Sequence, residues 1–342
     1  PYVTGESPEG SMEQIASTDL RSQLGNDCTT WSDVLDLCTN YQPAIMQVDP
    51  RGCLSNAHRC AVELSIFDAF GKLFATPLRD LTGQLDFARK IHHKSDRVQY
   101  SSAISSGGFR KEVLSSLAMR AYGFRHCKVK VGMQPDRDAM RLKRMRRFAG
   151  PRMDLRVDAN EAWTVDEAAS RIGELAPHRI SCVEQPVRHQ DVAGLAMVRK
   201  AVDVPLMLDE SLTSLRDAEL AIESGTCDLF NIRISKCGGF LNSLRLAAMA
   251  HEAGLGYQLG CHPGESAILS AAGRHFATSV NSIRYREGSA DRHLLKDSIA
   301  NEDMTFGRGG WAPALNAPGL GVTINDRMLT PMIQESQTFK IA

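Results

Sequence analysis

The stretch "HCKVKVG", His126–Gly132, has the pattern of a buried β-strand that carries two lysines. Successive side chains of a strand point to opposite sides, so Lys128 and Lys130 share one face while Val129 and Val131 share the other. Like charges side by side on a strand are unfavourable. The stretch therefore predicts anionic groups close to this strand.

Seven further stretches from about residue 98 onward look like strands, and most are separated from the next by an amphipathic helical pattern. They are "VQYSSAIS" (98–105), "DLRVDAN" (154–160), "SCVEQPV" (181–187), "VPLMLDES" (204–211), "LFNIRISKCGG" (229–239), "GYQLGCHPGE" (256–265) and "NSIRYREGS" (281–289). Eight strand–helix repeats over roughly 200 residues fit a closed parallel (β/α)₈ TIM-type barrel, whose typical length is about 250 residues. A doubly wound open sheet is the alternative, but it usually has fewer strands.

The domain organisation follows from the change of pattern along the chain. Residues 1–95 are predicted to form a mostly helical domain, in which Val62, Ile66, Phe70 and Leu73 line one helical face. Residues 96–310 are predicted to form the barrel. Residues 311–342 carry a turn pattern and then a short predicted strand, and we expect them to return to the N-terminal helical part.

The composition argues against several classes of partner. Lys plus Arg and Asp plus Glu both number 40, so the formal net charge of zero gives no support for binding nucleic acid or an anionic membrane. Nine cysteines without a C-x-x-C spacing are typical of reduced thiols in a cytosolic protein. No apolar run approaches transmembrane length, and the first ten residues do not resemble a secretion signal. We expect a cytoplasmic protein that binds neither nucleic acid nor membranes.

Three carboxylates stand at the ends of successive predicted strands, where barrels of this kind carry their catalytic groups. Asp158, Glu184 and Asp209 are 26 and 25 residues apart, one strand–helix unit each. One such residue could be a helix N-cap, but three in register with lysines nearby favour a metal site. A divalent cation would remove the repulsion between them. All-oxygen ligation predicts Mg²⁺ or, alternatively, Mn²⁺.

The lysines follow from such a cation, because a metal bound to a substrate carboxylate stabilises the enediolate that forms when the α-proton leaves. The base must be a neutral amine, and burial, a second ammonium and the metal all lower the pKa of a lysine. Lys130 on one side and Lys236 on the other could face opposite sides of a planar intermediate. Gly238 and Gly239 behind Lys236 predict close backbone packing.

Four further polar residues lie near the same strand ends and are expected to bind substrate or to support the residues above: Asn160, Glu210, His262 and Glu265. For His262 the alternative is a packed, hydrogen-bonded histidine.

Together these motifs resemble the enolase superfamily, and within it the muconate lactonizing enzyme subgroup of the mandelate racemase/muconate lactonizing enzyme family. The matching motifs are "KVK", "VDAN", "VEQP", "LDES" and "NIRISKCGG", and "AVELSIFDAFGKLFATPLRDLTG" is similar to the capping-domain helices of the family. The resemblance implies an α+β capping domain on a modified barrel, a small carboxylate substrate, and Mg²⁺-assisted abstraction of the proton α to that carboxylate. It also implies a homo-oligomer, a dimer or an octamer.

The resemblance assigns roles to individual residues. It implies that Lys130 is one acid/base and Lys236 the other, on the opposite face. It implies that Lys128 supports Lys130 electrostatically and contacts the substrate carboxylate. The implied metal ligands are Asp158, Glu184 and Asp209, and Glu265 stands where the family often has a seventh-strand glutamate.

Three departures from the family pattern bear on the function. The family begins with an antiparallel β-meander whose loop closes over the substrate, whereas "PYVTGES" resembles the segment after it, so we expect the meander to be missing here. Dipeptide epimerases carry Asp-x-Asp at the eighth strand, but the stretch "RYREGSADRHLL" has Arg286, Glu287 and Asp291, which disfavours a dipeptide substrate. The mandelate racemase subgroup has a His–Asp dyad where this chain has Lys236, so that subgroup is disfavoured.

The reaction and two rival functions stay open at this point. Racemisation or epimerisation needs both Lys130 and Lys236, whereas cycloisomerisation or dehydration could use one of them. A Schiff-base aldolase would use a strand-end lysine as nucleophile without a metal, and the three carboxylates count against it. A catalytically inactive enolase-like protein without its lid is the third hypothesis.

Overall fold

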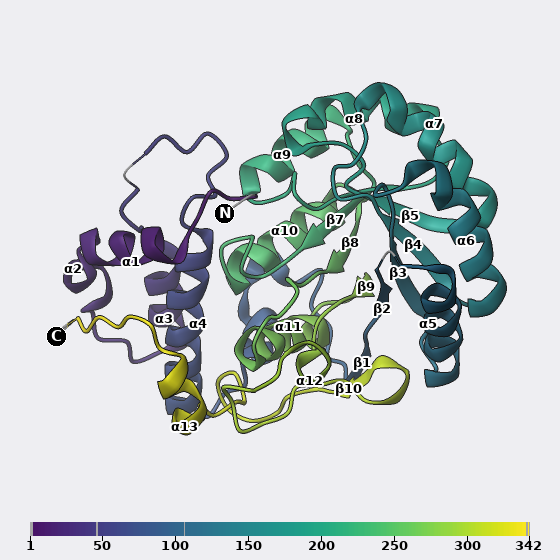
Figure 1. The fold of residues 1–342 in the computed structure, drawn as a ribbon. Coiled ribbons are helices and arrows are strands. Elements are labelled where there is room, and N and C mark those ends of the chain that lie inside the picture. The colour runs from purple at the N-terminus through teal and green to yellow at the C-terminus, as the bar shows by residue number, and fades with distance from the viewer. Residues whose placement is uncertain (1–2, 46, 106, 340, 342) are drawn as a thin grey trace.

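A curled parallel sheet forms the centre of the protein (Figure 1). The computed structural model describes residues 3–45, 47–105, 107–339 and 341, and within them strands β2–β9 form one sheet of eight strands that pair in chain order. The strands are β2 (Ser102–Ile104), β3 (His126–Lys130), β4 (Asp154–Asp158), β5 (Ile180–Glu184), β6 (Leu206–Leu208), β7 (Leu229–Ile232), β8 (Gly256–Leu259) and β9 (Ile283–Arg286). The pairing is parallel throughout, so the chain returns along a helix between strands.

The two edges of this sheet meet. Ser101, directly before β2, donates its backbone N–H to the carbonyl oxygen of Arg286 at the end of β9, with an N···O distance of 2.7 Å. The sheet therefore curls until its first and last strands lie side by side, and the predicted modified (β/α)₈ barrel is confirmed.

The first predicted strand, residues 98–105, is wrong in its extent. Its first half is part of β1 (Arg97–Gln99), which pairs antiparallel with β10 (Trp311–Pro313), and only its second half, β2, joins the barrel. The backbone changes partner at Tyr100, whose N–H donates to the carbonyl oxygen of Gly310 at 2.8 Å. One extended stretch of chain without a glycine or proline thus belongs to two sheets, because its backbone passes from one set of hydrogen-bond partners to another.

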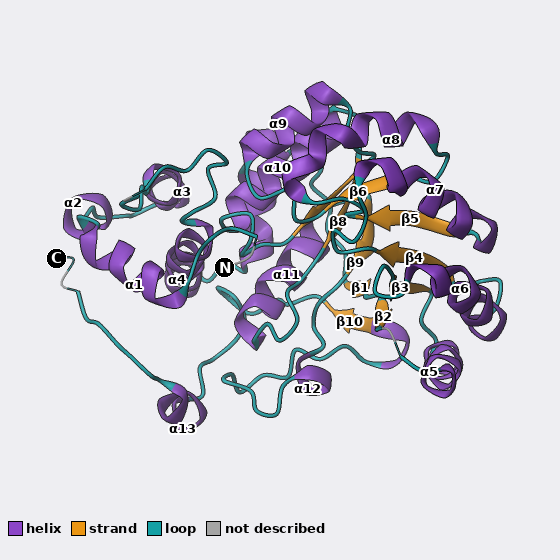
Figure 2. Ribbon diagram, turned by 45° about the horizontal axis from the view of Figure 1, so that its top comes forward, coloured by secondary structure: helices purple, strands orange, loops and turns teal. Residues whose placement is uncertain are grey.

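Helices surround the barrel and connect its strands (Figure 2). They are α5 (Phe109–Tyr122), α6 (Pro135–Ala149), α7 (Val165–Leu175), α8 (Leu195–Ala201), α9 (Leu215–Ser224), α10 (Phe240–Glu252) and α11 (Ala267–Ser279), followed by the short α12 (Asp291–Leu294). Their termini follow local sequence rules. Helix α7, for example, begins with a capping box in which the Thr164 hydroxyl accepts the N–H of Glu167 and the Glu167 carboxylate accepts the N–H of Thr164.

The N-terminal helices form a separate group beside α10 and α11 (Figures 1 and 2). They are α1 (Pro8–Ser17), α2 (Leu20–Leu24), α3 (Trp31–Asn40) and α4 (Asn56–Leu73), with 3₁₀ turns at Leu78–Gln84 and Asp86–Ala88. The C-terminal segment lies against α4, where the backbone N–H of Leu320 donates to Asp68 at 2.9 Å. The short strand expected after residue 318 is wrong: Ile324 makes a single bridge to Ala300, and helix α13 (Asp326–Leu329) follows. The domain boundaries at 95 and 310 stay predictions.

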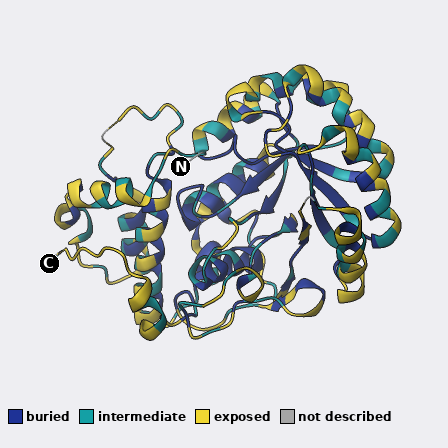
Figure 3. Cartoon of the chain, viewed as in Figure 1, coloured by how far each residue is buried: buried dark blue, intermediate teal, exposed yellow. Residues whose placement is uncertain are grey.

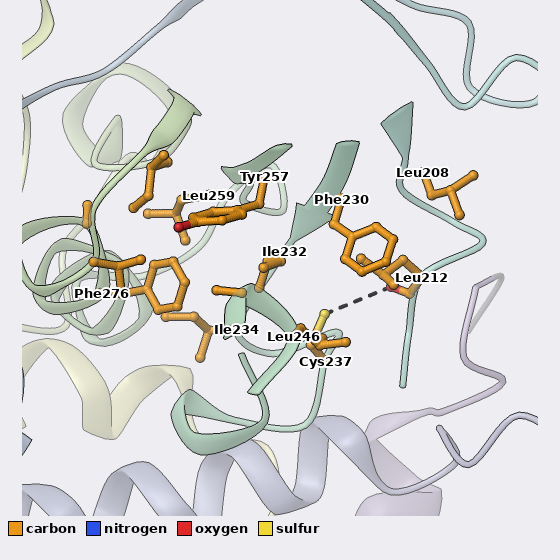
Figure 4. Close-up of a cluster of buried hydrophobic side chains, with 14 of the residues drawn as sticks. Leu208, Leu212, Phe230, Ile232, Ile234, Cys237, Leu246, Tyr257, Leu259 and Phe276 are labelled. Atoms are coloured by element: carbon orange, nitrogen blue, oxygen red, sulfur yellow. Dashed lines mark hydrogen bonds between the residues drawn. The ribbon is translucent and has the colours of Figure 1, made fainter. Parts of the chain in front are cut away.

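The core is continuous from the barrel strands to the inner faces of the helices (Figure 3). Figure 4 shows part of it, where Phe230 and Ile232 of β7 lie near Leu208 of β6 and Tyr257 and Leu259 of β8. A second, smaller group of buried side chains consists of Cys182, Met207, Leu229 and Tyr285. This group comes from β5, β6, β7 and β9. Polar residues follow it toward the carboxyl ends of these strands.

Candidate active site

The polar residues of the site stand directly beyond this smaller apolar group. Alternate residues of a strand share a face, so the residues two positions beyond Cys182, Met207, Leu229 and Tyr285 point the same way as these four. Those residues are Glu184, Asp209, Asn231 and Glu287. The site therefore lies at the carboxyl ends of the strands, above an apolar floor.

Asp158, Glu184 and Asp209 are all buried at this end of the barrel. Asp158 and Glu184 are direct neighbours in the ladder between β4 and β5, and Asp209 follows β6. Burial and the carboxylate of Asp158 raise the pKa of Glu184 to about 8, against the opposing effect of Lys128. Three buried carboxylates in adjacent strands thus need positive charge to stay ionised together.

Lys128 and Lys130 share a face, as the alternation predicts. The Nζ atoms of Lys128 and Lys130 lie 3.4 and 3.3 Å from the same atom, Oδ2 of Asp158. Their exposure differs: 7% of the Lys128 side chain is exposed against 39% of Lys130. Lys130 also donates to the side-chain oxygen of Asn160. Lys130 therefore faces the open side of the site, and Lys128 lies deeper.

The surroundings of Lys128 favour its charged form. Burial alone would lower the pKa of Lys128, but the carboxylates of Glu184, Glu287 and Asp158 together raise it well above its ordinary value. The physical reason is that all three carboxylates lie close to the ammonium: Glu184 and Asp158 are 3.4 Å from Nζ and Glu287 is 2.8 Å away. Lys128 is thus a fixed positive charge.

Arg156 and Glu287 belong to the same cluster, although the sequence motifs assign neither residue a role. Arg156 is fully buried, its Nη2 lies 2.5 Å from Glu287 Oε1, and its guanidinium lies over the Tyr285 ring at 4.5 Å from the centroid. Arg156 on β4 and Glu287, directly after β9, stand two positions from Asp158 and Tyr285 and therefore share the inward face with them. That period of two was the pattern that could have identified them.

Lys236 lies on the other side of the carboxylates. Its Nζ donates to the backbone oxygen of Asp209 at 2.6 Å, to Oδ1 of the same residue at 2.9 Å, and to the backbone oxygen of Asn231 at 3.0 Å. The chain order of strands places Lys130 on β3 and Lys236 after β7. Asp158 on β4, Glu184 on β5 and Asp209 directly after β6 come between them. The two lysines therefore flank the three carboxylates along the curled sheet.

Asn231 and Arg233 were also missed, although they alternate on the inward face of one stretch with Leu229. Asn231 Nδ2 donates to Glu184 Oε1 at 2.8 Å. The Arg233 guanidinium binds the carboxylate of Asp209 and lies 3.8 Å from Glu184 Oε1. Burial alone would raise the pKa of Asp209, but Arg233 and Lys236 hold it well below its usual range.

The remaining predicted residues come to the same end of the barrel. Asn160 Nδ2 donates to Glu210 Oε1 at 3.1 Å, and burial raises the pKa of Glu210 to about 7. Asn160 has a φ of 42°, in the left-handed region that is uncommon outside glycine and often found at functional sites. These two residues form a bridge between the ends of β4 and β6.

His262 and Glu265 form the loop after β8. The backbone N–H of His262 donates to Glu265 Oε1 at 2.8 Å, and His262 Nδ1 lies 3.4 Å from Arg233 Nη1. Burial and Arg233 lower the pKa of His262 to about 4, so its ring is neutral at neutral pH. Burial raises the pKa of Glu265 to about 7. The loop after β8 thus contacts Arg233, which in turn binds Asp209 and lies near Glu184.

The donor types fit a hard divalent cation. Asp158 Oδ2, Glu184 Oε2 and Glu210 Oε2 are buried oxygens without a hydrogen-bond partner in the described part of the chain, and Asp158 Oδ2 has only the ion-pair contacts with Lys128 and Lys130. Across these same residues no three His, Cys, Asp or Glu side chains stand at coordination spacing. Lys128 lies between Asp158 and Glu184, and Arg233 lies between Glu184 and Asp209. Carboxylate oxygens, once brought to coordination distance, would suit Mg²⁺ better than zinc.

The comparisons with known proteins agree with the fold. The model of the family "Enolase C-terminal domain-like" matches residues 112–328. The hydrophobic dipeptide epimerase of Enterococcus faecalis is 32% identical over 82% of this chain and 74% of its own.

Across residues 3–45, 47–105, 107–339 and 341, no helix is both long and apolar enough to span a membrane.

Two solved structures share the fold closely. The N-succinyl Arg/Lys racemase of Bacillus cereus superposes with a TM-score of 0.81 at 25% identity, covering 97% of this chain and 84% of that one. A muconate lactonizing enzyme gives a TM-score of 0.80 at 25% identity, covering 95% and 85%. These matches confirm the resemblance that the motifs indicate. The chain belongs to the enolase C-terminal domain-like family, and it is an isomerase or lyase of the enolase superfamily.

Proposed function

We propose that this protein racemises or epimerises a small carboxylate substrate by Mg²⁺-assisted abstraction of the α-proton. The observation that carries the proposal is the arrangement of two lysines on either side of three buried carboxylates. The relatives support it, because one is named an epimerase and another a racemase.

Asp158, Glu184 and Asp209 would hold the Mg²⁺, or Mn²⁺ as the alternative. When bound, the cation supplies Lewis-acid stabilisation of the charge that develops on the substrate carboxylate. Lys128 adds a fixed positive charge beside Asp158 and Glu184, suited to contact the same carboxylate. Asn160, Glu210, His262 and Glu265 would bind substrate or hold the ligands in position.

The two lysines move one proton each. In one direction Lys130 Nζ takes the α-proton from one face of the substrate, and the ammonium of Lys236 gives a proton to the other face. In the reverse direction the roles exchange, so the substrate gains one proton and loses one. The three oxygens around Lys236 Nζ orient its ammonium, and the greater exposure of Lys130 leaves its amine open to the substrate.

The substrate that suits this site is a carboxylate without a free ammonium group. Glu287 is the carboxylate nearest the eighth strand end, and it is already neutralised by Arg156 and Lys128. It therefore has little capacity to bind a further cation. An N-acylated amino acid fits this requirement, in keeping with the N-succinyl Arg/Lys racemase among the structural neighbours.

Isotope exchange tests the proposal directly. Carboxylic acids, including both enantiomers of N-succinylarginine, are incubated with the protein and Mg²⁺ in D₂O and analysed for α-deuterium. Lys130→Ala and Lys236→Ala should each lose exchange of a different enantiomer, while Lys143→Ala, at an exposed position of α6, should lose neither. If both site variants exchange both enantiomers like the parent, the lysine assignment is wrong.

The same assay separates the alternatives. A cycloisomerase or dehydratase would change the substrate skeleton in the mass spectrum. A Schiff-base aldolase would be trapped by borohydride without metal. An inactive enolase-like protein would bind Mg²⁺ and exchange no acid at all.

Several expectations stay predictions. We propose a homo-oligomer, a dimer or an octamer, which light scattering after gel filtration would measure. A cytoplasmic location and the lack of nucleic-acid and membrane partners also stay predictions.

A further inference from the structure

Helix α4, in the N-terminal part of the chain, contacts the segment that carries Lys236. Asn56, its first residue, is buried and donates its side-chain amide to the backbone oxygen of Lys236 at 2.6 Å. The same amide donates to the backbone oxygen of Thr213 at 2.6 Å. One side chain thus joins the segments that follow β6 and β7.

Glu63 makes a second contact two turns further along the same helix face. Its carboxylate accepts the backbone N–H groups of Phe240 and Leu241, the latter at 3.2 Å, at the start of α10. The first N–H groups of a helix lack partners within the helix, so a carboxylate there stabilises the helix start. Helix α10 therefore receives its N-terminal cap from α4, 177 residues earlier in the chain.

Gly238 and Gly239 make this close approach feasible. They have φ values of 83° and 115°, which L side chains rarely adopt. A Cβ at Gly238 would lie 2.7 Å from Asn56 Oδ1, and one at Gly239 would lie 2.5 Å from Glu63 Oε1. The backbone after Lys236 is thus packed against α4 without space for a side chain.

Lys236 is consequently held at both ends. Its ammonium is bound by Asp209 and Asn231, and its backbone oxygen by Asn56. Figure 4 shows the next residue, Cys237, directed into the core, with a hydrogen bond to the backbone oxygen of Leu212 at 3.9 Å. The position of the ammonium therefore depends on how the backbone of this segment lies on α4.

We infer that Asn56 and Glu63 are positioning residues for Lys236. The inference rests on the proposed function, in which Lys130 and Lys236 serve opposite faces of the substrate. Asn56 and Glu63 contact the segments after β6 and β7, whereas Lys130 lies on β3 with Asp158 and Asn160. Helix α4 thus sets the rate of proton transfer at the substrate face that Lys236 serves, and not at the face that Lys130 serves.

The test uses the full-length protein with Mg²⁺ in D₂O and the two enantiomers of N-succinylarginine as probes. Lys236→Ala should abolish the exchange of one enantiomer. Asn56→Ala and Glu63→Ala should slow the exchange of that same enantiomer by about tenfold or more, since a displacement of about 1 Å can lower a rate about a hundredfold. Exchange of the other enantiomer should stay at the parent rate. Glu63→Gln keeps an acceptor oxygen and should restore most of the loss.

Ser65→Ala, at an exposed position of the same helix, is the matched control and should change neither rate. Equal slowing of both enantiomers by Asn56→Ala would overturn the inference, because a general loss of stability acts on both faces. A failure of Lys130→Ala and Lys236→Ala to separate the enantiomers would instead contradict the proposed function.

A second measurement does not depend on turnover. Amide hydrogen exchange of residues 236–241 should be faster in Asn56→Ala and Glu63→Ala than in the parent, while residues 126–130 of β3 should be unchanged. If amide hydrogen exchange of residues 236–241 is as slow in both variants as in the parent protein, the inference is overturned, whatever the exchange rates of the two enantiomers.

Discussion

Lys128 lies among four charged groups, and their balance explains why a lysine can be buried there. Its ammonium contacts Asp158 at 3.4 Å, Glu184 at 3.4 Å and Glu287 at 2.8 Å, and Glu287 also binds Arg156. Buried charges are tolerated when each has an opposite partner, and removal of one partner leaves the other unpaired. At the scale of single residues, Glu287 therefore stabilises the protein by neutralising two buried cations, Lys128 and Arg156.

Glu287→Gln should lower the free energy of unfolding by about 3–5 kcal/mol, because it leaves Arg156 and Lys128 with one counter-charge fewer. Urea unfolding measures the change. Glu252→Gln is the matched control, since Glu252 pairs with Lys90 at the surface. An exposed pair contributes about 0–1 kcal/mol, and equal small losses in the two variants would contradict the argument.

His275 provides a pH-dependent contribution to stability at the same scale. It is buried on α11, its Nδ1 accepts the backbone N–H of Arg79 at 3.2 Å, and its Nε2 donates to the backbone oxygen of Leu320 at 3.0 Å. Burial lowers the pKa of His275 from its ordinary 6.5 to about 4. The native state therefore holds the neutral ring, whereas the unfolded chain takes up a proton below pH 6.5.

The stability that His275 contributes should accordingly be complete above pH 6.5 and lost as the pH falls toward 4. Unfolding free energies measured across this window should fall less steeply for His275→Gln than for the parent. His251→Gln, at an exposed position of α10, should keep the parent slope. A parental slope in His275→Gln would contradict the assignment.

At the scale of elements, the junction between β7 and α10 combines a strained backbone with a contact from α4. Gly239→Ala adds a Cβ 2.5 Å from Glu63 Oε1 at a φ of 115°. Gly254→Ala tests the backbone contribution alone, because Gly254 has a φ of 72° and nothing within 4 Å of the added atom. The two positions therefore separate steric contact from conformational strain.

Gly254→Ala should lower the free energy of unfolding by about 1–2 kcal/mol, and Gly239→Ala by about 1–3 kcal/mol more. Thermal or urea unfolding measures both. Glu63→Ala combined with Gly239→Ala should lose less than the sum of the single changes, because the clash disappears with the carboxylate. Additive losses would show that α4 does not press on this junction.

At the scale of the whole molecule, the proposed metal links strands β4, β5 and β6 and should stabilise the native state by mass action. At a Mg²⁺ concentration of about 100 times the dissociation constant, the free energy of unfolding should rise by about 2.7 kcal/mol. Calorimetry with and without Mg²⁺ measures the rise. Asp209→Asn should abolish it, and Asp166→Asn, at an exposed position of α7, should preserve it. An unchanged rise in Asp209→Asn would contradict the assignment of Asp209 as a ligand.

Part of this architecture follows from local rules alone. The alternation of strands and helices, the shared face of Lys128 and Lys130, and the sites of polar residues at strand ends depend on backbone periods of two and 3.6. These periods act between residues close in sequence. The barrel and the charged groups at its carboxyl end could therefore be predicted. The division between β1 and β2 could not, since no glycine or proline separates them while their hydrogen-bond partners come from distant segments.

The sequence by itself determined the order of strands and helices and the carboxylates and lysines at the strand ends. Only the tertiary structure decided which polar groups meet. Arg156 and Glu287 are 131 residues apart, and Asn56 and Lys236 are 180 apart. These contacts form only because the barrel closes and α4 packs beside α10, so their geometry depends on long-range packing that no local pattern records.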